Sequence, residues 1–151
     1  MNKFIDYINQ GKSNNSVNEK IELPSDTGSV NILLTETLHF ANQIQLWHWL
    51  AVSGQKHTTL GDFYNSLREN IDSLAETLIA QAISPLTRGS KTLDVNYSDE
   101  VIKYQTKEYR QFITNIIDQL STDKSDIANV RDMVVDIQEC IDKFIYQFDL
   151  E

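Results

Sequence analysis

Hydrophobic residues recur at three- and four-residue steps through most of the chain, which is the period of an amphipathic α-helix. The first such stretch covers about residues 30–53, with Ser29 as its cap and Ser53-Gly54 as its stop. The second follows after a very short connection and lasts until Ser84-Pro85. Its apolar stripe consists of Leu60, Phe63, Leu67, Ile71, Leu74 and Leu78. A connection this short makes the two helices antiparallel neighbours.

Two further helices are predicted in the second half of the chain. One runs from the Ser98-Asp99-Glu100 cap to about residue 120, and the other from after residue 125 to about residue 148. Between the second and third helices, residues 85–97 contain a proline and a glycine and have no helical period. This segment is long enough to cross the length of a bundle. The pattern therefore predicts an all-α fold, a four-helix bundle with a long crossover between its second and third helices.

The predicted domain organisation is a flexible N-terminal arm, residues 1–28, followed by one bundle, residues 29–151. The single cysteine, Cys140, excludes an internal disulfide and favours a reducing cytoplasm. Placed among apolar residues of the last helix, it is expected to pack as a small apolar side chain. The apolar runs are too short for a membrane span or a secretory signal, so we expect no contact with a membrane.

The chain is acidic, with 13 basic against 22 acidic side chains and a formal net charge of −9. Binding to nucleic acid without sequence preference would need a local basic cluster that overrides this field, and the sequence contains none. Residues 1–28 hold three lysines against four acidic residues. We therefore expect no DNA binding.

Metal ligation is the catalytic chemistry that the residue types leave open, since phosphate-loop and nucleophile-elbow motifs are absent. The candidates are His48, His57, Asp72 and Glu76. The two carboxylates lie about 40° apart around the helix axis and could share an ion. They face away from the stripe around Leu67, so the site cannot close within one subunit. The simpler interpretations are a solvated acidic face and, for His48, a buried histidine satisfied by hydrogen bonds.

Two neighbouring patterns complicate the choice of ligands. Glu36 and His39 have the Glu-x-x-His spacing of di-iron bundles, but only one copy exists and His39 lies on the opposite side of its helix from His48. His39 is therefore interpreted as a surface residue. Thr59 and Asp62 have capping-box spacing, and a helix that begins there would leave His57 in a loop.

The order His48-Trp49, His57 and Asp72-Ser73-Leu74-Ala75-Glu76 resembles the ferroxidase signature of the Dps miniferritins. In that family a His-Trp pair on the first helix is followed by a histidine and an Asp-x-x-x-Glu motif on the second. The interval from His57 to Glu76 agrees with the family pattern, whereas the interval from His48 to His57 is three residues shorter than usual. The resemblance covers about residues 30–148. The sequence is also similar to small ferritin-like proteins of tailed phages.

The resemblance implies a ferritin-like bundle that binds ferrous iron between subunits and oxidises it with oxygen or peroxide. The histidines would come from one subunit and the carboxylates from its two-fold partner, within a homo-oligomer between a dimer and a hollow twelve-subunit shell. Iron storage or oxidative protection would follow. The alternative, from another class, is a non-catalytic ferritin-like bundle with a structural, assembly or partner-binding role, located in a virion if the chain is phage-encoded.

Overall fold

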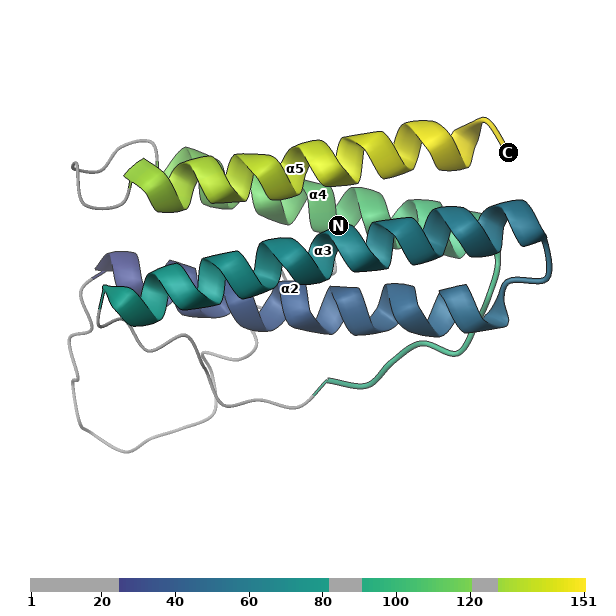
Figure 1. Ribbon diagram of the computed structural model, residues 1–151, viewed down its shortest axis with the longest axis horizontal. Helices are drawn as coiled ribbons and strands as arrows, with labels where there is room; N and C mark the ends of the chain where they lie inside the picture. The colour runs from purple at the N-terminus through teal and green to yellow at the C-terminus, as the bar shows by residue number, and fades with distance from the viewer. Residues whose placement is uncertain (1–24, 82–90, 121–127) are drawn as a thin grey trace.

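The computed structural model describes residues 25–81, 91–120 and 128–151. Its helices are α2 (Ser25–Leu50), α3 (Gly54–Ala80), α4 (Asp99–Leu120) and α5 (Ala128–Asp149) (Figure 1). Helices α2 and α5 lie at opposite corners, and each packs against both α3 and α4. Neighbouring helices run antiparallel (Figure 1). The described residues contain no strand, which confirms the predicted all-α fold with four helices.

The ends of α2 differ from the predicted ends. The helix begins at Ser25, inside the segment assigned to the arm, and ends at Leu50 instead of residue 53. Ser29 is therefore an internal residue and does not cap the helix. The helix includes Gly28, but a glycine within a helix costs only about 1 kcal/mol relative to alanine, which a 26-residue helix can absorb. The rest of the predicted arm, residues 1–24, lies outside the described residues.

Helix α3 begins directly after a three-residue turn. Ser53 is its N-cap, with an extended backbone and a hydroxyl that accepts a hydrogen bond from the Lys56 N–H (3.5 Å). The His57 N–H then donates to the Ser53 carbonyl (2.9 Å), which is the first regular bond of the helix. A helix start at Thr59 is therefore wrong, and His57 lies in the first turn of α3.

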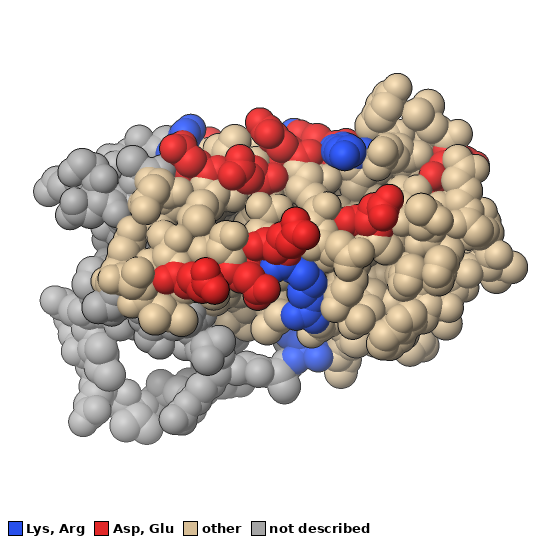
Figure 2. All heavy atoms as spheres, in the orientation of Figure 1, with Lys and Arg blue, Asp and Glu red and all other residues tan. Residues whose placement is uncertain are grey.

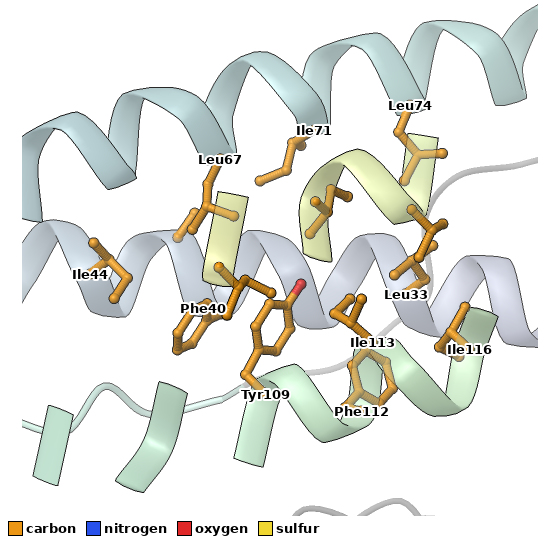
Figure 3. Close-up of a cluster of buried hydrophobic side chains, with 14 of the residues drawn as sticks. Leu33, Phe40, Ile44, Leu67, Ile71, Leu74, Tyr109, Phe112, Ile113 and Ile116 are labelled. Atoms are coloured by element: carbon orange, nitrogen blue, oxygen red, sulfur yellow. The ribbon is translucent and has the colours of Figure 1, made fainter. Parts of the chain in front are cut away.

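The core runs along the inner faces of all four helices (Figure 3). The buried residues of α3 are the six of its predicted stripe. One polar pair lies inside this core, where the Tyr109 ring stacks on Phe40 (4.1 Å between centroids) and its hydroxyl contacts the Thr37 hydroxyl. Thr37 donates in turn to the Leu33 carbonyl (2.7 Å). Burial raises the pKa of Tyr109, so this phenol remains neutral at physiological pH.

The segment 91–97, here named the strap, runs along α2 in an extended conformation (Figure 1). Side chains on successive turns of α2 bind it: Glu36, His39, Gln43 and Trp47. Their partners, in the same order, are Lys91, Thr92, Asp94 and Asn96. From His39 to Trp47 each step is four residues of helix, about 6.0 Å, against two residues of extended chain, about 6.6 Å, so the two repeats stay in register.

The strap explains the Glu-x-x-His pattern of α2. Glu36 is buried and forms an ion pair with Lys91, while His39 Nε2 donates to the Thr92 carbonyl (3.1 Å). Gln43 uses both ends of its amide, because Nε2 donates to the Asp94 carbonyl (2.8 Å) and Oε1 accepts from the Asp94 N–H (2.7 Å). The half-exposed His39 is thus a structural residue rather than a free surface group.

No helix among the described residues is both long and apolar enough to cross a membrane. The outer faces of α3 and α5 carry many acidic side chains (Figure 2). The exposed carboxylates of α3 are Asp62, Glu69, Asp72 and Glu76. Those of α5 are Asp132, Asp136, Glu139, Asp142 and Asp149.

Cys140 packs against the core as predicted, and burial raises the pKa of its thiol to about 11. An ordinary thiol has a pKa of about 8.5, so the native protein should react with a thiol reagent at pH 8 more than about 100-fold more slowly than the urea-unfolded chain. The folded state also keeps a proton that the unfolded state loses, so this group lowers the free energy of unfolding as pH rises from about 9 to 11. Equal labelling rates for native and unfolded protein would contradict this assignment.

Candidate functional site: the histidine corner

His48 and His57 meet where α2 turns into α3. His48 lies in the last turn of α2, and the short turn capped by Ser53 brings His57 directly against it. The two imidazole rings stack with 3.8 Å between their centroids and 29° between their planes. His48 Nδ1 lies 2.7 Å from the His57 carbonyl oxygen, and His57 Nδ1 lies 2.8 Å from the His48 carbonyl oxygen. The stretch 48–57, here named the histidine corner, is closed by this reciprocal pair.

The reciprocal bonds determine where the protons lie on both rings. A carbonyl oxygen only accepts hydrogen bonds, so Nδ1 carries the proton on His48 and on His57. In the neutral imidazole this leaves Nε2 with its lone pair, which is the form that binds a metal. Neither Nε2 takes part in a hydrogen bond with another described residue. His39 has the opposite arrangement, since its Nε2 is occupied by the strap.

A shallow, open hollow of about 310 Å³ lies beside His48 between α2 and α3. Its polar lining includes Gln45, Asp62 and Asn65, and one side is formed by Trp49, whose side chain is 66% exposed. Half-exposed His48 is therefore neither sealed in the core nor fully in solvent. A ligand group can approach this histidine from outside the bundle.

The two candidate carboxylates lie elsewhere on α3. Asp72 and Glu76 are exposed, as their outward placement predicted, and neither forms an ion pair with another described residue. Fifteen residues of helix separate Asp72 from His57, which is about 22 Å. Among the described residues no group of three or more histidine, cysteine or acidic side chains is placed to hold a metal ion. One chain thus brings the histidines together and leaves the carboxylates apart from them.

Sequence reasoning identified both histidines but missed how they interact. The reciprocal bonds depend on the length of the turn, and the signal for that length was Ser53, interpreted as a helix stop although it caps the next helix. It also missed Gly61, which lies against the His48 ring. A glycine in the middle of a regular apolar period was the signal available for it.

Comparison with protein-family models, curated proteins and solved structures gives no match to this chain. The interpretation of the histidine corner therefore depends on its own geometry and on the sequence resemblance.

Proposed function

We propose that this chain is a ferritin-like, Dps-like protein that binds ferrous iron between two subunits and oxidises it, with oxygen or peroxide as the electron acceptor. His48 and His57 of one subunit and Asp72 and Glu76 of the other supply the ligands. The observation that carries the proposal is the reciprocal pair of Nδ1–carbonyl contacts, which places the proton on Nδ1 of both rings and leaves two Nε2 atoms available for a metal. Imidazole and carboxylate ligands together suit redox-active iron.

The histidine pair and the carboxylate pair lie at different places along α3. Their separation determines where a two-fold axis must pass for the carboxylates of one subunit to reach the histidines of the other. In an antiparallel α3 pair whose two-fold axis passes near residue 68, position 72 lies level with position 64 along the helix axis, and position 76 lies level with position 60. Tyr64 and Gly61 both line the hollow beside His48. The partner's Asp72 and the partner's Glu76 would then enter that hollow. A single dimer would contain two equivalent sites, because the arrangement is isologous.

The acidic surface supports a requirement for cations at this interface. Joining two α3 faces brings together the exposed carboxylates of both chains, and none of the described basic side chains forms an ion pair with Asp72 or Glu76. Like charges in contact are unfavourable unless metal ions or protons neutralise them. Metal binding and association should therefore be coupled, and chelation should loosen the oligomer.

The variant Asp72→Asn with Glu76→Gln tests the proposal, since it removes both charges and keeps side-chain size. The wild type should bind ferrous iron anaerobically, oxidise it when oxygen or peroxide is added, and gain mass in solution. The double variant should lose metal binding and iron oxidation, keep its helical circular dichroism and associate without metal. Iron titration, ferric absorbance and light-scattering mass measure these quantities.

A matched control is available on α5, where Asp132 and Asp136 form another exposed carboxylate pair at the same four-residue spacing. The variant Asp132→Asn with Asp136→Asn removes the same charge far from the histidine corner, so it should leave iron oxidation unchanged. If both double variants behave alike, or if the wild type takes up no iron, the ferroxidase proposal fails.

A second function is favoured by the apolar side chains that the histidine corner exposes. Trp49 is 66% exposed and Val52 95% exposed. In a non-catalytic bundle used for structure or assembly, these residues would contact a protein partner and the acidic faces would serve solubility. A wild-type protein that stays monomeric and neither binds nor oxidises iron would favour this second function.

A further inference from the structure

Gly61 lies on α3 against the edge of the His48 ring. A methyl group at this position would lie 2.9 Å from His48 Cε1 and 3.1 Å from His48 Nδ1. Non-bonded carbon atoms are most stable at about 3.5–4.0 Å, so any side chain at position 61 would force the ring to move.

The His48 ring has no alternative position that keeps its other contacts. Its Nδ1–H is bonded to the His57 carbonyl at 2.7 Å, and its face lies on the His57 ring. The edge of the ring that faces Gly61 includes Nδ1. Displacement of the ring away from α3 would therefore move the atom that donates the hydrogen bond to the His57 carbonyl. The stacking and the tautomer of His48 therefore depend on the missing side chain at position 61.

We propose that Gly61 is a positioning residue of the histidine corner. Its lack of a side chain lets the His48 ring lie against α3, hold its Nδ1–H on the His57 carbonyl and keep Nε2 available to a divalent transition metal. The metal-binding part deepens the proposed function and depends on it, whereas the positioning part does not.

A glycine at this place is otherwise unfavourable. Gly61 lies within the 27-residue helix α3, where alanine would stabilise the helix. If Gly61 had no steric role, Gly61→Ala should raise the melting temperature. The proposal predicts the opposite tendency, because the gain in helix stability is offset by displacement of His48. The two interpretations thus differ in the direction of a measurable shift.

A double-mutant cycle separates these effects. In the wild-type background Gly61→Ala should lower the melting temperature or leave it unchanged. In the His48→Ala background, where the ring is gone, the same substitution should raise it. Non-additivity of this kind reports a direct contact. Equal increases in both backgrounds would overturn the proposal. If Gly61→Ala alone does not fold but the double variant does, the steric coupling is also demonstrated.

Nuclear magnetic resonance of the histidine ring nitrogens tests positioning without any metal. The wild type should show His48 and His57 as single Nδ1–H tautomers, and Gly61→Ala should remove that single form for His48. Gly54→Ala is the matched control, since Gly54 also lies in α3 and a methyl group there meets no atom within 4 Å. An unchanged His48 signal in Gly61→Ala would overturn the proposal.

Zn²⁺ titration by calorimetry tests the metal-binding part with a redox-inert ion. Loss of a group that orients a ligating histidine typically weakens metal binding about 10–100-fold, which is the loss expected for Gly61→Ala but not for Gly54→Ala. If Zn²⁺ binds wild type and Gly61→Ala equally, the metal-binding part is wrong. If the wild type binds no Zn²⁺ while the tautomer of His48 still depends on Gly61, the proposed function fails and the positioning role stands.

Discussion

Replacing Trp47 with alanine should lower the free energy of unfolding by about 3–5 kcal/mol. The Trp47 side chain is fully buried, and its indole N–H donates to the Asn96 carbonyl (3.1 Å). The substitution therefore creates a cavity in the core. It also removes the hydrogen bond that holds the C-terminal end of the strap to α2. Because a domain of this size is stable by only about 5–15 kcal/mol, the loss should be evident in urea unfolding.

Trp49 supplies the matched control two residues away. It is the same residue type on the same helix, but its side chain is 66% exposed. Trp49→Ala should change stability by no more than about 0.5 kcal/mol, as is usual for surface positions. Similar losses in the two variants would mean that Trp47 does not occupy the core position described above.

The sequence was sufficient to predict the helices, because their signal is local and periodic. The six buried residues of α3 are those of its three- and four-residue stripe. The start of α2 was less accessible, since Gly28 resembles a break and only the stability of the whole helix outweighs it. The role of Ser53 was ambiguous for a similar reason, because a serine before a glycine can end one helix or begin the next.

Residues 85–97 were predicted as a non-helical crossover, but the contacts of the strap with α2 could not be predicted, because an extended segment without a hydrophobic period does not indicate which helix it lies beside. The polar stripe on α2 was visible as Glu36 and His39, but its meaning depends on which chain segment lies beside it. The histidine corner could be predicted from the sequence only in part. Residue types and spacing selected His48 and His57, whereas their shared tautomer follows from tertiary geometry. The pairing of either histidine with Asp72 requires a second chain and stays a prediction.

Removing the Lys91 ammonium group that neutralises Glu36 should also lower the free energy of unfolding by several kcal/mol, about 3–5. Glu36 is 6% exposed, and Lys91 at the start of the strap is its partner. Lys91→Met keeps the length of the side chain and leaves a buried carboxylate without its charge partner. Removing one member of a buried ion pair costs about 3–5 kcal/mol, and we expect the lower end because Lys91 retains 19% exposure.

The same substitution at Lys103 provides the comparison. Lys103 forms an ion pair with Asp149 (2.8 Å), but both side chains are at least 40% exposed. Exposed pairs contribute only about 0–1 kcal/mol, so Lys103→Met should be nearly neutral in urea unfolding. Lys91→Met should also increase amide hydrogen exchange in residues 91–97, because Glu36 no longer holds that end of the strap. Equal stability losses at the two lysines would show that the buried position of Glu36 contributes nothing, and the strap would then be held by His39, Gln43 and Trp47.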